Sequence, residues 1–319
     1  MRFRSRPETK PVRRIALALA VLLSASVVTF TLADTTGGLR APSIELPNKA
    51  GSVKFAAIGD MGTGERPQFE VAERMEACRQ IFPFNFAVML GDNIYGWDGG
   101  DGLKTKFEQP YKTLLDAGVK FHASLGNHDN RAEIYYKNFG MNGQRFYTFR
   151  KENAQFFALD TNYMDPGQLA WLKKELSESS ATWKICFFHH ALYSHAEMHG
   201  SDVDLRAQLE PIFVENGVKL VLAGHDHVYE RLKLQKGIQY FVVGNSGKLR
   251  AGSLKRSPET AVGFDRDQCF LLLEIAGETL HFQAISRAGE TVDRGEISAG
   301  GVQPKSGASA ASAAAGSSR

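Results

Sequence analysis

Residues 84–95 read FNFAVMLGDNIY, a largely apolar run that ends abruptly in glycine, aspartate and tyrosine. A short apolar and aromatic run of this kind is typical of a buried strand. Gly91 allows the backbone to turn sharply where the run ends. Asp92 and Tyr95 are therefore expected just past the carboxyl end of the strand, where ligands bind in open α/β sheets. The stretch predicts a buried strand that presents polar groups at that end.

The same pattern recurs along the chain, with helical stretches between the apolar runs. The predicted strands are Val53–Ile58, Phe84–Leu90, Val119–Leu125, Gln155–Leu159, Trp183–Phe188 and Val218–Ala223, followed by Tyr240–Val243, Cys269–Ile275 and Leu280–Ser286. The predicted helices are Gln68–Ile81, Pro110–Ala117, Pro166–Ser177 and Leu205–Asn216, the third with Asp165 as its N-cap. Alternating strands and helices, then a strand-rich end, predict α/β layers around two packed sheets.

The two ends of the chain are expected to lie outside this domain. Residues 1–33 combine a basic start with the uncharged stretch 15–33, which is typical of a secretory signal, and an uncleaved membrane anchor is the alternative. Residues 34–51 are predicted to be a linker and 52–298 a single domain. Residues 299–319, rich in Gly, Ser and Ala, are predicted to be a disordered tail. We therefore expect a periplasmic or secreted protein, or one anchored facing outside the cytoplasm.

Charge and cysteine content point away from nucleic-acid binding and from a cysteine metal site. Six basic residues and Glu8 give residues 1–33 a charge of +5, so the remaining chain carries −2 of the overall +3. No nucleic-acid partner is expected from that balance. Cys78, Cys186 and Cys269 stand in apolar surroundings without metal-type spacing, and we predict that all three are buried.

Five short motifs follow predicted strands and together supply the ligands of a two-metal site. They are Asp60-Met61-Gly62, Gly91-Asp92-Asn93-Ile94-Tyr95, Gly126-Asn127-His128-Asp129, His189 and Gly224-His225-Asp226-His227. A carboxylate shared between two cations, such as Asp60 or Asp92 could supply, offsets their mutual repulsion. An amide oxygen and several imidazoles suit iron, zinc or manganese better than calcium. Each motif alone is weak, but the five in this order predict a phosphoester hydrolase with two metals.

These motifs resemble the metallophosphoesterase (calcineurin-like) superfamily, and their details look like its purple acid phosphatase branch. Most of the superfamily has Asp-x-His in the first motif and Gly-Asp-x-x-Asp in the second, whereas this chain has Gly62 and Tyr95 there. That paired change suits a phenolate ligand to ferric iron. The resemblance covers residues 53–287 and implies a four-layer α/β/β/α sandwich of two mixed β-sheets flanked by helices.

Carried over residue by residue, the resemblance implies two metal sites that share Asp92. The first site would hold Fe(III), and the second Fe(II), Zn(II) or Mn(II). The first uses Asp60, Asp92, Tyr95 and His227, and the second uses Asp92, Asn127, His189 and His225. His128 and His199 match the histidines that contact the substrate phosphate in this family, with His195 as an alternative to His199. His190 is expected to point the opposite way from His189 on its strand and to be structural.

The implied activity is hydrolysis of small phosphomonoesters by in-line attack of a metal-bound hydroxide, with His128 or His199 as the proton donor. The protein would then be an exported acid phosphatase. A phosphodiesterase that acts on nucleotides or phospholipid head groups with the same metals is the alternative. A non-catalytic phosphate- or metal-binding surface protein is a third reading, which a missing ligand would favour, and none is missing. The sequence predicts no oligomeric state.

Overall fold

The computed structural model of the protein describes residues 43–300. The predicted signal or anchor at 1–33 and nearly all of the predicted tail therefore lie outside the described residues. The described part of the predicted linker lies against the domain, because the Glu45 N–H donates to Gln283 Oε1 at 2.8 Å and the Lys49 N–H to Glu274 Oε1 at 2.6 Å. Within residues 43–300, no helix has the length and apolar character needed to cross a bilayer.

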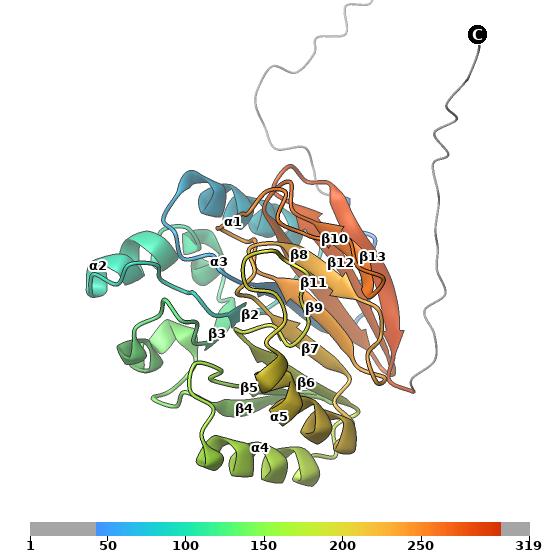
Figure 1. The fold of residues 1–319 in the computed structure, drawn as a ribbon. Coiled ribbons are helices and arrows are strands. Elements are labelled where there is room, and N and C mark those ends of the chain that lie inside the picture. The colour runs from blue at the N-terminus through green and yellow to red at the C-terminus, as the bar shows by residue number, and fades with distance from the viewer. Residues whose placement is uncertain (1–42, 301–319) are drawn as a thin grey trace, which may run out of the picture. The chain divides into compact units, whose positions relative to one another are not determined.

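The structure contains two mixed β-sheets (Figure 1). The first sheet contains the parallel strands that come first in the chain. Its strands are β1 (Val53–Ile58), β2 (Phe86–Leu90), β3 (Lys120–Ser124), β11 (Cys269–Ala276), β12 (Thr279–Ser286) and β13 (Thr291–Ser298). They lie in the order β13-β12-β11-β1-β2-β3. Strands β1, β2 and β3 run parallel, and the other three are antiparallel to their neighbours. The carboxyl ends of β1, β2 and β3 therefore meet at one edge of the sheet.

The second sheet repeats this plan. Its strands are β4 (Tyr147–Lys151), β5 (Ala154–Ala158), β6 (Trp183–Phe188), β7 (Leu220–Ala223), β8 (Tyr229–Leu232), β9 (Gln239–Val243) and β10 (Thr260–Phe264). They lie in the order β10-β8-β9-β7-β6-β5-β4, with β5, β6, β7 and β9 parallel. The edge strand β4 and the pair β8 and β10 are antiparallel to their neighbours.

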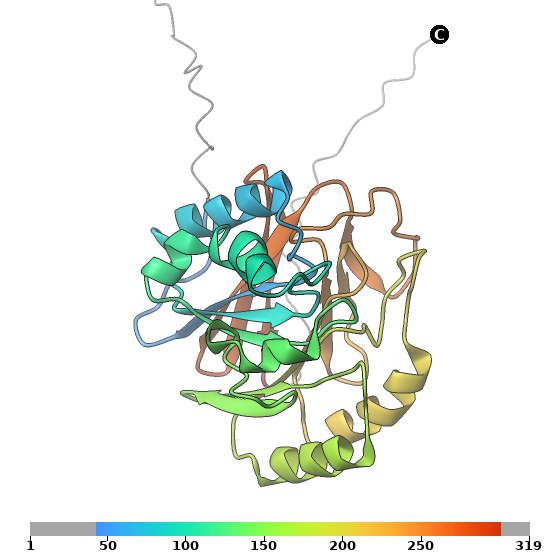
Figure 2. The ribbon, with the colours of Figure 1, turned by 90° about the vertical axis from the view of Figure 1, so that its left-hand side faces the viewer.

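Helices cover the outer faces of both sheets. They are α1 (Arg66–Arg79), α2 (Gly100–Leu103), α3 (Lys112–Asp116), α4 (Pro166–Glu178) and α5 (Val203–Glu215), with a π-helical turn at Lys104–Glu108 and 3₁₀ turns at Arg131–Tyr135 and Lys137–Phe139. Figure 2 shows α1, α2 and α3 on one side of the sheets and α4 and α5 on the opposite side. As predicted, Asp165 caps α4, accepting the Gln168 N–H, and proline opens the helix.

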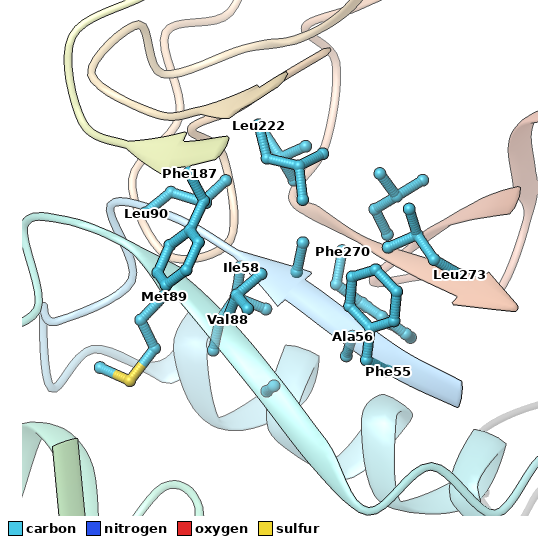
Figure 3. Packing of buried hydrophobic residues seen from close by; sticks show 14 of the residues in the cluster. Phe55, Ala56, Ile58, Val88, Met89, Leu90, Phe187, Leu222, Phe270 and Leu273 are labelled. Atoms are coloured by element: carbon cyan, nitrogen blue, oxygen red, sulfur yellow. The ribbon is translucent and has the colours of Figure 1, made fainter. Parts of the chain in front are cut away.

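Side chains of the parallel strands in the second sheet are divided between two apolar clusters. On β6, Ile185 and Phe187 belong to the cluster between the sheets, and Cys186 and Phe188 belong to the cluster that includes α4 and α5. Figure 3 shows Phe187 within the first cluster, beside Met89 and Leu90 of β2. Because both faces of these strands are buried, they read as continuous apolar runs in the sequence.

The predicted fold class, two mixed sheets in a four-layer sandwich with flanking helices, is confirmed. The three cysteines are buried and free, as predicted. Four strands had no predicted counterpart, namely β4, β8, β10 and β13. Helix α2 and the π-helical turn that follows it also had no predicted counterpart.

Candidate metal centre

Each predicted metal ligand lies just past the carboxyl end of a parallel strand or in the loop that follows. Asp60 follows β1, Asp92 follows β2 and Asn127 follows β3, while His189 follows β6 and His225 follows β7. Contacts between the two sheets bring these ends together. The His225 N–H donates to Asp60 Oδ2 at 2.8 Å, and His189 Nδ1 bonds the carbonyl of Leu90 at 2.9 Å. The ligands from the two sheets therefore converge on one place.

Asp60, Tyr95 and His227 form one half of this centre, here called the tyrosine half. Tyr95 Oη lies 3.2 Å from Asp60 Oδ1 and 3.2 Å from His227 Nε2. His227 Nε2 is in turn 3.4 Å from Asp60 Oδ1. One carboxylate, one phenol and one imidazole thus present their ligand atoms to the same point.

Asn127, His189 and His225 form the other half, here called the histidine half. His189 Nε2 lies 2.9 Å from Asn127 Oδ1 and 3.0 Å from His225 Nδ1. Because Nδ1 of His189 donates to a carbonyl, its Nε2 carries a lone pair in the neutral ring. Asp92 Oδ1 is 3.4 Å from the same Nε2, and ligand atoms of Asp60, Asp92 and His189 lie within 4.8 Å of one another. Asp92 therefore stands between the two halves.

Three ligand residues hold a left-handed backbone conformation that side chains rarely adopt. The φ angles are 53° at Asp60, 51° at Asp92 and 71° at His225. Such residues outside glycine are uncommon and cost about 1 kcal/mol or more each, and they gather at functional sites. The hydrogen bonds of the neighbouring strand ends hold these turns, so the backbone sets the position of each predicted ligand side chain.

Gly62 explains how Tyr95 reaches the centre. A Cβ at Gly62 would lie 1.8 Å from the carbonyl oxygen of Asn93, so only glycine fits there. The Gly62 N–H donates to the Asp92 carbonyl at 3.2 Å, and its own carbonyl accepts the Tyr95 N–H at 2.9 Å. The first motif thus lies directly against the second, and the phenol of Tyr95 is turned toward Asp60.

Burial sets the protonation of the ligand groups. Burial, and then the charge of Asp92, raise the pKa of Asp60 well above its usual value. Burial lowers the pKa of His189, that of His225 to about 2 and that of His227 to about 4. Burial also raises the pKa of Tyr95, and the charges of Asp60 and Asp92 add to this.

This set of groups fits cations. Neutral imidazoles offer lone pairs, and the buried carboxylates of Asp60 and Asp92 lie beside the phenol of Tyr95, whose pKa they raise. A bound metal ion offsets the cost of burying such charges and removes the proton from a coordinating phenol. The residues present therefore fit two metal ions, one in each half, with Asp92 between them.

The two predicted substrate-contact histidines lie at the mouth of the centre, one beside each half. The His128 ring is 4.8 Å from the Tyr95 ring, and the His199 ring is 4.1 Å from the His225 ring. Both side chains are exposed. His195, the alternative to His199, instead bonds Glu230 at 2.8 Å and lies away from the ligands.

The expected orientation of His190 is wrong. Its ring lies 4.5 Å from the ring of His225, and ligand atoms of His189, His190 and His225 are within 4.8 Å of one another. Strand β6 ends at Phe188, so the alternation of side chains along a strand does not extend to His190. The Thr161 hydroxyl, 2.8 Å from His190 Nδ1, holds the ring in this position.

A cavity opens beside the histidine half. Its volume is about 470 Å³, and Asn127, His190, Asn162, Tyr163 and Arg145 are among the residues that line it. Arg145 is not free, since it pairs with Asp160 at 3.1 Å. The cavity is thus a polar recess that begins at a metal ligand.

Sequence reasoning missed two cations beside the tyrosine half, Lys248 and Arg250. Lys248 Nζ lies 4.9 Å from the centre of the Tyr95 ring, and the Arg250 N–H donates to the His227 carbonyl at 3.0 Å. The only signal in the sequence is a basic, glycine-containing stretch, 244–252, after β9. It forms no motif that separates it from an ordinary surface loop.

The chain matches the calcineurin-like phosphoesterase family over residues 53–229, more than half of its length, and it belongs to that family. Purple acid phosphatase 4 of Arabidopsis thaliana is 28% identical over 294 residues, which cover 79% of this chain and 85% of that protein. Tartrate-resistant acid phosphatase type 5 of Rattus norvegicus is 25% identical over 260 residues, covering 68% and 79%.

A solved structure shows the same fold. Purple acid phosphatase PPD1 from yellow lupin seeds superimposes with a TM-score of 0.66 at 17% identity, covering 79% of this chain and 55% of that one. The resemblance to the purple acid phosphatase branch is confirmed, and the chain is an enzyme of the phosphoesterase type. That family implies a binuclear metal site, which the two halves of the centre fit.

Proposed function

We propose that this protein is an exported acid phosphatase that hydrolyses small phosphomonoesters at a two-metal centre. The observation that supports it most is the convergence of all seven predicted ligands, from both sheets, with Asp92 between the two halves. We assign Fe(III) to the tyrosine half, because hard anionic oxygens suit that ion. We assign Fe(II), Zn(II) or Mn(II) to the histidine half. Export rests on the signal-like residues 1–33.

The residues of the centre have different roles in the proposed reaction. When bound, the two ions would polarise the phosphate and lower the pKa of a bound water. The rigid turns at Asp60, Asp92 and His225 fix where the phosphate sits, so little reorganisation is needed during in-line displacement. His128 and His199 are exposed at the mouth, and either can donate a proton to the leaving alkoxide.

A phosphodiesterase with the same metals is the second candidate, and the cavity beside Asn127 favours it. A diester carries a second substituent that needs room beside the phosphate, and about 470 Å³ would hold one. A monoester with a large leaving group would use the same space. Relative rates on aryl monoesters and aryl diesters distinguish these two activities.

Tyr95→Phe tests the assignment of the tyrosine half. We expect the purified protein to contain iron and to show a visible band from a phenolate bound to Fe(III). The variant should lose this band and its iron, keep the metal of the histidine half, and fall in activity by more than about 100-fold, since outer partners of metal ligands already cost 10–100-fold. Metal analysis, the visible spectrum and ester hydrolysis measure these three effects.

Tyr135→Phe is the matched control, because Tyr135 is 77% exposed and outside the centre. It should leave the band, the metal content and the activity unchanged. A wild-type protein that is colourless, free of iron and fully active on monoesters would overturn the assignment. Faster hydrolysis of diesters than of monoesters would move the proposal to the second candidate.

A further inference from the structure

The segment 246–250 is fixed to the backbone of the tyrosine half. The Ser246 N–H donates to the Gly59 carbonyl at 3.1 Å, the Lys248 N–H to the Asp60 carbonyl at 2.9 Å and the Arg250 N–H to the His227 carbonyl at 3.0 Å. Three bonds at alternate residues set the register of this segment on two ligand residues. Its side chains are therefore placed by the same turns that place the ligands.

Gly247 makes this close approach possible. A Cβ at that position would lie 2.4 Å from the carbonyl oxygen of Met61, the residue next to the ligand Asp60. With glycine there, the segment lies directly on the first motif. A displacement of Lys248 and Arg250 away from the centre would break the hydrogen bonds on both sides of Gly247.

Lys248 and Arg250 are cations without a carboxylate partner among residues 43–300, and both are half-buried. Some other half-buried arginines of the domain do have a carboxylate partner, such as Arg231 with Asp293 at 2.7 Å and Arg287 with Asp267 at 2.8 Å. The buried Nε of Arg250 also lacks a hydrogen-bond partner in the described part of the chain. A half-buried positive charge without a partner costs free energy, and a bound anion that pairs with it would offset this cost.

The positive charge lies beside the tyrosine half. Lys248 Nζ is 4.9 Å from the centre of the Tyr95 ring, and the backbone of Arg250 is hydrogen-bonded to the backbone of His227. The two cations are therefore close enough to the centre to act on an anion bound there.

We propose that Lys248 and Arg250 bind the anionic oxygens of the substrate phosphate and select monoester dianions over diester monoanions. This rests on the proposed phosphatase function. Above about pH 6, a phosphomonoester carries close to two negative charges, whereas a diester carries one. Charge-assisted hydrogen bonds from lysine and arginine strengthen with the charge of the acceptor, and arginine can bond two phosphate oxygens at once. Two added cations thus stabilise a bound monoester more than a bound diester.

The test compares Lys248→Met and Arg250→Met with Arg256→Met in the metal-containing protein at pH 7. Arg256 is exposed on the same loop, which makes it the matched control. We expect the Kd of inorganic phosphate, measured by calorimetry, to rise about tenfold or more in each of the first two variants, as for loss of a charged hydrogen bond. The monoester-to-diester ratio of kcat/KM should fall by a similar factor. The control should change neither quantity.

Metal content and Tm are measured alongside, so that loss of the fold is recognised. If Lys248→Met does not fold, Lys248→Gln removes the charge in its place, and if neither folds, Arg250→Met decides the question alone. An unchanged phosphate Kd in well-folded variants overturns the inference, and so does an equal loss on monoesters and diesters. If the wild-type protein hydrolyses neither ester, the proposed function fails. Phosphate binding then still decides whether these two cations bind the anion.

Discussion

The tyrosine half and the histidine half of the metal centre share Asp92 but differ in the charge of their other ligands. The tyrosine half offers a carboxylate and a phenol beside His227, whereas the histidine half offers an amide oxygen and two imidazoles. Anionic oxygens stabilise a trivalent ion most, and neutral nitrogens suit divalent ions. One fold can therefore hold two different metals a short distance apart by the charge of the side chains that each sheet supplies.

The two halves also differ in their surroundings. Lys248 and Arg250 lie beside the tyrosine half, while a cavity of about 470 Å³ opens beside the histidine half. Positive charge suits phosphate oxygens, and an open polar recess suits the rest of the ester. The comparison suggests that the charged end of a substrate and its leaving group are directed to opposite halves.

The position of the proton donor tests this arrangement most strongly. His128 stands beside the tyrosine half and His199 beside the histidine half, where the cavity lies. If the leaving group enters the cavity, His199→Ala should lose about 100-fold on esters with poor leaving groups, as is typical of general acids, and much less on good ones. His128→Ala should lose activity on both to a similar degree. Rates across a series of aryl and alkyl phosphates measure the difference.

The reverse pattern, with a selective loss in His128→Ala, would place the leaving group beside the tyrosine half. No selective loss in either variant would remove both histidines from the role of proton donor. His281→Ala serves as a control, because His281 lies on β12 beside Glu296, outside the centre and the cavity.

Gly62→Ala should break the tyrosine half alone. The added methyl would meet the Asn93 carbonyl oxygen at 1.8 Å, so the second motif must move and carry Tyr95 with it. We expect a loss of about 1–3 kcal/mol in stability, as for overpacking, together with loss of the visible band. The metal of the histidine half should remain. Thermal unfolding, spectroscopy and metal analysis report these effects.

Gly100→Ala is the control for that change, since a Cβ there meets nothing within 4 Å and its φ is not in the left-handed range. It should leave stability and the spectrum close to those of the wild type. An intact band in a stable Gly62→Ala protein would show that the contact of the two motifs does not position Tyr95.

The smallest expected effect is on the pH dependence of stability, and it comes from His122, a largely buried histidine outside both halves of the centre. Burial, and then the charge of Lys151, lower the pKa of His122 to about 4, against about 6.5 in an unfolded chain. The unfolded state therefore binds more protons between these values. The contribution of neutral His122 to stability is complete above pH 6.5 and is lost as the pH falls toward 4.

His122→Phe removes this dependence. The His122 ring stacks on Phe149 at 3.9 Å, and both ring nitrogens are buried without a hydrogen-bond partner among residues 43–300, so an apolar ring is tolerated. Between pH 7.5 and pH 5 the variant should gain up to about 2 kcal/mol relative to the wild type in urea unfolding. Equal changes for the two proteins would mean that His122 titrates normally.

Much of the centre could be predicted because its ligands follow buried strands. Apolar runs locate β1, β2, β6 and β7, and the polar residues after them are the predicted ligands, which the fold brings together. Strand β13 was missed because it is mostly exposed and has only Val292 and Ile297 as apolar residues, and β10 because it is short and contains a glycine. Lys248 was missed for a different reason. Its position depends on a hydrogen bond to Asp60, far away in the sequence, and no local pattern reports such a contact.

At the left-handed turns of Asp60, Asp92 and His225, the residues that the activity needs are not the residues that would make the protein most stable. Glycine adopts this conformation without penalty, so a sequence chosen for stability alone would place it at all three positions. The chain keeps two carboxylates and an imidazole there, at a cost in conformational free energy for each. Glycine at these positions should thus yield proteins that are more stable and inactive, and thermostability screens that ignore catalysis would select them.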